Sequence, residues 1–315
     1  MSIYSKILVV ADINHDEQPA LARAMQLAQK STSVSHITFF LSIYDFSYDM
    51  TSMLSFEERD AMRKGVIHQR EQWMRSIAEP YLDKSVQFDI KVVWHNRPYE
   101  AIIGEIFAGE HDILIKATRK HDMLESVIFT PTDWHLMRKC PTPVLLVKNA
   151  DWPENANIIA SVHVGSELDT HIDLNDRMVE QLLNLSKRLG ASPYLVNAYP
   201  VTPANITIEL PEFDPTTYTD AVRGHHLTAM KALRQKHSLS EEQTLVQQGL
   251  PEDVIPEAVK QLNAAMVILG TTGRTGLSAV FIGNTAEHVI DKINCDVLAL
   301  KPNGYVSPLD PQTAI

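Results

Sequence analysis

Apolar and polar positions along the chain form two successive series of strand-like runs and helix-like stretches. Five short apolar runs occur in the first half, and five more follow in the same order in the second. Between them, apolar residues recur at helical spacing. The runs lie at 6–12, 36–44, 88–94, 112–117 and 144–148, and at 157–163, 194–199, 244–248, 266–270 and 297–301. Strands alternating with helices predict a parallel sheet covered on both faces, once in each half.

The repeat predicts the domain organisation of the chain. The sequence is 315 residues long, enough for about two domains. We expect two tandem doubly wound α/β domains over residues 1–150 and 151–305, joined by a polar, proline-containing linker at 149–156. The tail at 306–315 has no periodicity, and we expect it to be loosely ordered.

Composition narrows the classes of partner. The formal net charge is −11, which disfavours direct nucleic-acid binding because phosphate backbones require a basic face. No apolar run approaches the roughly 20 residues that span a bilayer, so membrane insertion is not expected. The first apolar run is followed directly by Asp12 and is typical of a strand rather than a signal peptide. We therefore expect a cytoplasmic protein with a small-molecule partner.

A glycine-rich segment follows the fourth strand of the second half. It runs from Gly270 to Thr285, and nine residues separate Gly273 from Gly283. Glycine lets a ligand approach the backbone closely, and a helix N-terminus with free N–H groups attracts anions. In open α/β sheets, ligands bind at the carboxyl ends of the strands. These features predict a nucleotide phosphate site in the second half.

The strand order, the glycine spacing and the repeat resemble the tandem type of the universal stress protein family. The resemblance covers nearly the whole chain. It implies a Rossmann-like fold of the adenine nucleotide alpha hydrolase type, with the two halves packed as a pseudo-dimer through their fifth strands. It also implies a stress response that includes survival of DNA damage. ATP is the implied ligand, in the second domain only, and the implied site residues are His163, Leu269, Gly270, Gly273, Gly283, Asn284 and Thr285.

Two positions in the second half depart from the family pattern. Asn284 stands where ATP-binding members have Ser or Thr, although Thr285 follows it. His163 ends the first strand where those members have an aspartate that contacts the nucleoside.

The first half shows the reverse pattern, because it keeps Asp12 and lacks the glycine-rich loop. Aligning Val144 with Val297 gives an offset of 153 residues. The counterparts of Gly270, Gly273, Gly283 and Asn284 are then Ala117, Lys120, Thr130 and Pro131. Proline has no N–H group to offer a phosphate. We therefore expect no family-type triphosphate site in the first half.

Other chemistries have weaker support in the sequence. His163, Val164 and Gly165 resemble the start of the nucleotidylyltransferase His-x-Gly-His signature, but Ser166 follows instead of histidine. The Ser-Gly-Gly-x-Asp-Ser loop of ATP pyrophosphatases is absent. Neither a catalytic set nor a metal set stands out, and His225 and His226 are adjacent residues that point in different directions on a helix.

Three functional hypotheses therefore remain open. The first is a nucleotide-binding module or sensor, the second is a slow ATPase that uses the same loop, and the third is a binder of a non-nucleotide apolar ligand in the divergent first half. The acidic and apolar segment at 209–215 is either a lid over the second-half site or a packed connector. The sequence leaves open whether pseudo-dimers assemble further.

Overall fold

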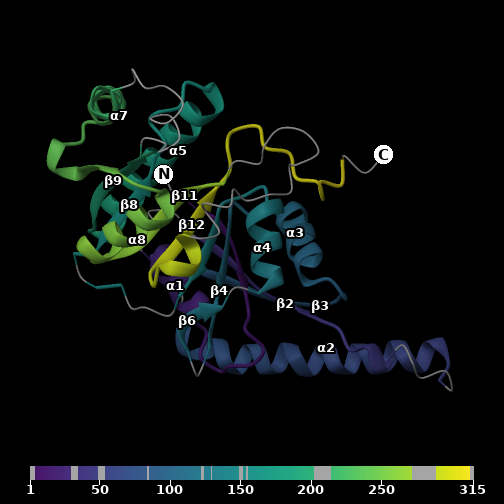
Figure 1. Cartoon of the computed structure of the whole chain (residues 1–315). Helices are drawn as coiled ribbons and strands as arrows, with labels where there is room; N and C mark the ends of the chain where they lie inside the picture. The colour runs from purple at the N-terminus through teal and green to yellow at the C-terminus, as the bar shows by residue number, and fades with distance from the viewer. Residues whose placement is uncertain are drawn as a thin grey trace. The chain divides into compact units, whose positions relative to one another are not determined.

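The structure is a computed structural model that describes residues 4–29, 35–48, 54–83, 85–121, 124–128, 130–148, 152–153, 155–201, 214–271 and 289–312. The chain forms two compact units. The first comprises Met1–Asn149 together with Val306–Ile315, and the second comprises Ala150–Tyr305 (Figure 1).

The first unit is built on parallel strands in the order β3-β2-β1-β4-β7. These are β1 (Lys6–Val10), β2 (His36–Ile43), β3 (Gln87–Trp94), β4 (Ile113–Ala117) and β7 (Val144–Val147). The central strands are apolar and almost fully buried, as expected for a sheet covered on both faces. After β4 the chain forms a small antiparallel hairpin of β5 (Arg119–His121) and β6 (Leu124–Ile128) that the hydrophobic pattern did not predict.

Among the described residues of this unit, four helices cover the sheet. They are α1 (Pro19–Gln29), α2 (Phe56–Ala78), α3 (Pro98–Gly109) and α4 (Pro131–Lys139), with short 3-10 turns η1 (Phe46–Tyr48) and η2 (Glu79–Tyr81). The helix α3 packs beside α4 (Figure 1), and α1 packs on β1, β4 and β7. Ser55 begins α2 with a capping box, since its hydroxyl accepts from Glu58 N while the Glu58 carboxylate accepts from Ser55 N.

The second unit repeats the arrangement in the order β10-β9-β8-β11-β12. Its strands are β8 (Asn157–Ser161), β9 (Ser192–Tyr199), β10 (Thr244–Gln248), β11 (Ala264–Gly270) and β12 (Asp296–Leu300). Its helices are α5 (Asp169–Leu189), α7 (Pro215–Lys236) and α8 (Pro251–Gln261), with the 3-10 turn η3 (Glu241–Gln243). Asp176 on α5 accepts from Lys236 Nζ at 2.7 Å and pairs with His237 Nε2 at 2.8 Å, which ties α5 to the end of α7.

These two units confirm the predicted doubly wound parallel α/β fold, and every predicted strand lies within two residues of its observed bounds. In each unit the strand order reverses beside the first strand, between β1 and β4 and between β8 and β11. The carboxyl ends of the strands at such a reversal form the usual ligand crevice of open α/β sheets. The pairing of the two fifth strands across the units stays a prediction.

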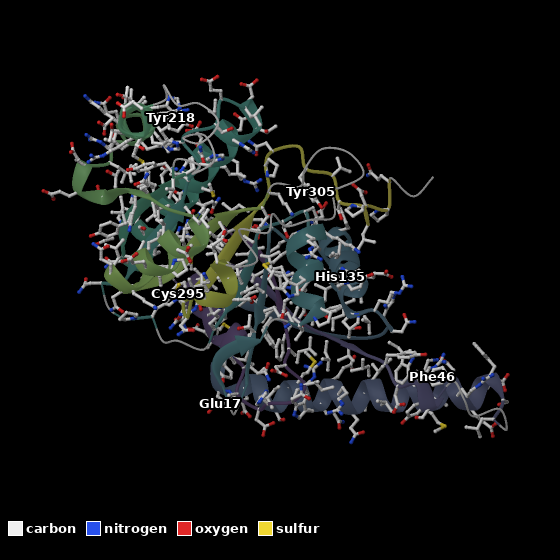
Figure 2. The ribbon with its side chains drawn as sticks, in the orientation of Figure 1. Glu17, Phe46, His135, Tyr218, Cys295 and Tyr305 are labelled. Carbon is white, nitrogen blue, oxygen red and sulfur yellow. The ribbon has the colours of Figure 1, made fainter. Side chains whose placement is uncertain are left out.

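The tail after Tyr305 is held more firmly than its sequence suggests. Tyr305, labelled in Figure 2, lies with its ring 4.7 Å from Lys301 Nζ. Ser307 is buried, and its hydroxyl donates to the carbonyl of Lys139 at the end of α4 over 2.6 Å. Leu309 N in turn donates to the Ser307 hydroxyl. The expectation of a loosely ordered tail is therefore wrong for this part of it.

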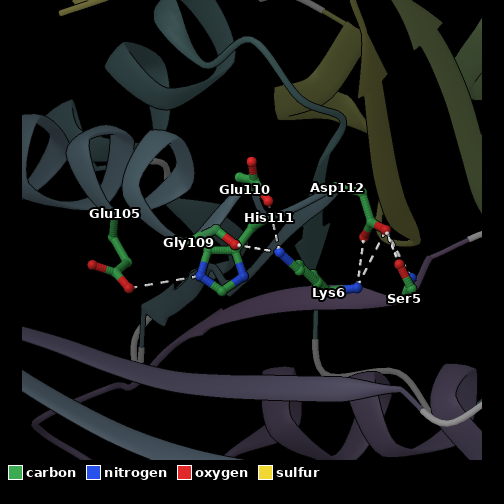
Figure 3. A network of polar contacts seen from close by, with 7 residues as sticks. All are labelled: Ser5, Lys6, Glu105, Gly109, Glu110, His111 and Asp112. Atoms are coloured by element: carbon green, nitrogen blue, oxygen red, sulfur yellow. Dashed lines mark hydrogen bonds and ion pairs between the residues drawn. The ribbon is translucent and has the colours of Figure 1, made fainter.

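A polar network joins the start of β1 to the connection between α3 and β4 (Figure 3). The Asp112 carboxylate accepts from Ser5 N at 2.7 Å, from the Ser5 hydroxyl at 2.9 Å and from Lys6 N at 3.2 Å. Lys6 Nζ donates to the Gly109 carbonyl at 3.2 Å and pairs with Glu110 at 2.9 Å. These bonds fix the amino-terminal edge of the sheet, at the opposite ends of the strands from the ligand crevice.

His111 is buried beside this network. Its Nε2 lies 3.7 Å from Glu105 Oε1, which is too long for a hydrogen bond (Figure 3). Neither ring nitrogen has a hydrogen-bond partner among the described residues. Burial lowers the pKa of His111 below its ordinary value, although the nearby Glu105 carboxylate acts in the opposite direction.

Candidate ligand site in the second unit

A pocket of about 370 Å³ opens at the carboxyl ends of β8, β9, β10 and β11. It lies at the strand-order reversal of the second unit, where an open α/β sheet offers a crevice. Its size falls in the range of small-molecule sites. The lining residues are Ser161, Val162, His163, His171, Leu174, Asn175, Met178, Asn197, Ala198, Pro200, Gly249, Leu250, Pro251, Ile255, Leu269, Gly270 and Val289.

A buried asparagine fixes the backbone at His163. Asn175 Oδ1 accepts from His163 N at 2.9 Å, and Asn175 Nδ2 donates to His163 O at 3.1 Å. The first unit contains the same device, because Gln18 Oε1 accepts from Asp12 N at 2.9 Å and Gln18 Nε2 donates to Asp12 O at 2.9 Å. Both carboxamides are almost fully buried. The two bridges show that His163 and Asp12 hold equivalent positions at the ends of their strands.

A second asparagine braces the neighbouring strand. Asn197 on β9 donates from Nδ2 to the Val162 carbonyl at 3.0 Å and accepts from His226 Nδ1 at 2.8 Å. The His226 ring also packs against Gly165, where an ideal Cβ would lie only 2.3 Å from His226 Cε1. Close packing therefore explains the glycine two residues after His163. His226 is buried and bonded to Asn197, so it is part of the wall behind the site.

The His163 side chain opens onto the pocket beside a second imidazole. The ring centroids of His163 and His171 are 5.3 Å apart, and His171 Nδ1 lies 2.7 Å from the Ser166 hydroxyl. The His163 ring makes no hydrogen bond within the described part of the chain. The pocket walls desolvate it, and together with the nearby His171 they lower its pKa below the ordinary value.

The structure places three of the predicted site residues together. His163, Leu269 and Gly270 all line the pocket. Gly273, Gly283, Asn284 and Thr285 lie outside the described residues, as does residue range 209–213 of the predicted lid or connector. The site assignment for those positions stays a prediction.

Comparison with known proteins places this architecture in a family. The universal stress protein family matches residues 3–148 and 169–301, once in each unit. The chain belongs to the universal stress protein family. It is 55% identical over 311 residues to universal stress protein E of Salmonella typhi and 53% identical to that of Escherichia coli K12, with 98% of each chain covered in both cases. These relatives identify it as a stress-response protein.

Solved structures of similar proteins share this fold. A functionally unknown protein from Pseudomonas aeruginosa PAO1 superposes with a TM-score of 0.70 at 26% identity, covering 95% of this chain and 93% of the other. A universal stress protein from Archaeoglobus fulgidus superposes with a TM-score of 0.61 at 13% identity, covering 94% and 98% of the two chains. The second likeness shows the shared fold alone.

The two universal stress protein domains make the same hydrogen bonds directly after their fourth strands. Thr118 follows β4 and donates from its N–H to Val147 O at 2.9 Å, and Thr271 follows β11 and donates to Leu300 O at 2.8 Å. Their hydroxyls donate to the same carbonyls. Thr118 and Thr271 are 153 positions apart, and so are Val147 and Leu300, which is the offset predicted from the sequence.

At this offset Gly283 corresponds to Thr130, which is the N-cap of α4 in the first domain. The Asp133 carboxylate accepts from Thr130 N at 2.7 Å and from the Thr130 hydroxyl at 2.8 Å. Lys116 Nζ pairs with the other Asp133 oxygen at 2.7 Å, and Asp133 is fully buried. In the first domain, the first turn of α4 therefore carries a carboxylate, that of Asp133, close to the position that corresponds to Gly283.

The sequence interpretation missed three residues that shape the site. Asn175 is a polar residue within the apolar stripe of α5, and Asn197 is a polar residue within the apolar β9. Such isolated carboxamides in apolar runs are the signal that could have indicated them. His171 offers no such signal, since it lies in an ordinary polar first turn of a helix.

Two other classes of site are absent from the described residues. No helix in the described ranges is long and apolar enough to span a bilayer. Across the same residues, no three or more His, Cys, Asp or Glu side chains converge as a metal ligand set. The rings of His225 and His226 are T-shaped to one another, with centroids 5.7 Å apart.

Proposed function

We propose that the second domain binds a nucleotide of the ATP class in this pocket, as the ligand-sensing part of a cytoplasmic stress protein. The observation that supports this most directly is the position of Gly270. It lines the pocket at the end of β11, and the glycine-rich segment begins at this residue. A ligand in the pocket would therefore have its phosphates beside that segment.

The walls of the pocket suit the base and sugar of a nucleotide. Leu174, Met178 and Ile255 are buried apolar side chains that line it. The carboxamides of Asn175 and Asn197, which hydrogen bonds hold in place, supply polar groups among the lining residues. An apolar cavity with a few fixed polar groups is typical of sites that bind flat heterocycles.

The described lining residues favour binding over catalysis. They include neither a carboxylate nor a lysine or arginine that could act on a phosphate. A slow ATPase would need such groups from elsewhere. The largely apolar walls also support a second candidate, a non-nucleotide apolar ligand, and mass spectrometry of ligand released from purified protein distinguishes it from a nucleotide.

The family role extends this proposal to the cell. We infer that the protein supports survival under stress, including conditions that damage DNA, without contacting nucleic acid directly. The two domains would act as an intramolecular pseudo-dimer. Loss of the gene should lower survival after DNA damage, and a nucleotide-free variant of the second domain should fail to restore it.

Calorimetric titration of the full chain with ATP tests the site. A Cβ at Gly283 would obstruct the approach of phosphate, so Gly283→Val should weaken binding about tenfold or more. Gly224→Val is the matched control, because Gly224 lies in α7 with no atom within 4 Å of an added Cβ. Equal affinities for ATP in wild type and Gly283→Val would refute the assignment. Phosphate release measured on the same samples separates a sensor from a slow ATPase.

A further inference from the structure

The two histidines give the pocket an unusual chemical character. Among the described residues that line it, His163 and His171 are the only ionisable side chains. Their rings lie 5.3 Å apart between centroids, His163 from the end of β8 and His171 from the first turn of α5. The Asn175 bridge fixes the backbone of His163, and the Ser166 hydroxyl contacts His171. The pair is therefore positioned by contacts that leave the His163 ring facing the cavity.

This arrangement selects for the charge of the ligand. Imidazoles donate hydrogen bonds and accept a proton near neutral pH, whereas a carboxylate only accepts. In the first domain the equivalent position is Asp12, whose oxygens are already engaged by Asn14 N at 3.0 Å and by His15 Nδ1 at 3.0 Å. In the second domain no carboxylate among the described lining residues opposes an anion.

We propose that His163 and His171 together form a receptor for a phosphate group of the ligand, and that this phosphate binds together with a proton. The proposal rests on the proposed nucleotide-binding function and specifies how its site recognises charge. The chemical class is a phosphate monoester. The group is either the 5′-phosphate of an adenosine monophosphate or a phosphate on the ribose of the nucleotide, and both are monoesters that present the same dianion to the pair.

The surroundings of His163 explain why a proton should bind together with the phosphate. Desolvation and the neighbouring His171 lower its pKa, which disfavours the protonated ring in the free protein. Among the described residues, His226 on α7 also interacts electrostatically with His163, and it adds no negative charge. A phosphate between the two rings would stabilise the protonated imidazole. Affinity should therefore rise as the pH falls from neutrality, and it should level off once His163 is protonated in the free protein.

The experiment is isothermal titration calorimetry on the full chain at about pH 7.5 and about pH 6. Each titration is repeated in two buffers of different ionisation enthalpy, which gives the number of protons taken up. The probes are adenosine, adenosine 5′-monophosphate, adenosine 2′- and 3′-monophosphates, and inorganic phosphate. The variants are His163→Gln and His171→Gln, in which the side chain still donates a hydrogen bond but cannot gain a proton. His68→Gln is the control, since His68 is an exposed imidazole on α2.

We expect at least one phosphate-bearing probe to bind wild type about tenfold tighter than adenosine does, with proton uptake. Both the preference and the uptake should be lost in His163→Gln and retained in His68→Gln. The tightest monophosphate shows which phosphate the pair holds.

Equal binding of adenosine and its monophosphates without proton uptake would overturn the histidine receptor and leave the proposed nucleotide site intact. Proton uptake that persists in a variant carrying both His163→Gln and His171→Gln would also overturn it. If inorganic phosphate alone binds with proton uptake, the receptor stands and the nucleotide function fails. If no probe binds, both proposals fail.

Discussion

Replacing Gly270 by alanine should destabilise the second domain by about 1–3 kcal/mol, the usual cost of forcing an extra methyl group into a packed core. An ideal Cβ at Gly270 would lie 2.6 Å from Leu174 Cδ2, 3.1 Å from Leu174 Cγ and 3.4 Å from Met178 Sδ. Both side chains belong to α5 and are almost fully buried. Either the leucine changes rotamer toward the pocket that it lines, or α5 shifts away from β11.

The change in stability is measured by urea unfolding, with hydrogen exchange as the probe. Hydrogen exchange is needed because a protein of two domains need not unfold in one step, and peptides from β11 and β12 report on the second domain alone. Gly224→Ala is the matched control. It lies exposed in α7 with open space around it, and helix propensity predicts a stabilisation of about 0.5–1 kcal/mol.

The two outcomes differ in what they say about the glycine-rich segment. If Gly270→Ala unfolds at the urea concentration of wild type, packing against α5 does not explain this glycine. If the variant is destabilised but binds ATP with unchanged affinity, Gly270 serves the contact between α5 and β11, and phosphate recognition depends on the later glycines.

Two further predictions concern the first domain. Asp133→Asn leaves the Lys116 ammonium without its counterion in a site where Asp133 is fully buried, so the free energy of unfolding should fall by about 3–5 kcal/mol. The control is Asp60→Asn, which removes an exposed ion pair with Lys64. Equal urea midpoints for the two variants would contradict this prediction. Burial lowers the pKa of His111 in the folded state, so the unfolded chain protonates first as the pH falls. The stability that His111 contributes is therefore present above about pH 6.5 and lost as the pH falls below it toward the folded-state pKa. His111→Gln should flatten the dependence of the urea midpoint on pH between about 7 and 5, and an unchanged slope would refute this assignment.

The sequence predicted the fold well because buried parallel strands leave a strong pattern. Runs such as Ile7 to Val10 and Val267 to Leu269 are continuous and apolar, and the same series of runs recurs in the second half of the chain. Short connections and right-handed crossovers then leave few ways to assemble such strands. The position of His163 at a strand end followed from the same pattern, because polar residues cluster where a buried strand leaves the sheet.

The contacts of the site were harder to predict because they depend on distant residues. The bridge between Asn175 and His163 spans twelve positions, and the Asn197 contact with His226 spans twenty-nine. Nothing in the local sequence indicates which polar group will face a carboxamide in the core. The β5–β6 hairpin was missed for a related reason, since its short strands lack the apolar run that marks a sheet interior.

The two domains differ in the partners of the polar residues that lie at equivalent positions. Gln18 and Asn175 build the same backbone bridge, and Thr118 and Thr271 make the same bonds to the fifth strand. The framework is therefore retained, and the differences are confined to groups that would face a ligand. In the first domain Asp12 is bound by its own loop, and Asp133 neutralises Lys116 inside the protein.

In the second domain His163 and His171 face a cavity, and the adjoining strand leads into a glycine-rich segment. A domain whose charges are satisfied internally gains stability without a ligand, whereas one that leaves its imidazoles facing a pocket gains stability only when something binds. A nucleotide should therefore raise the unfolding temperature of the second domain and leave that of the first domain nearly unchanged.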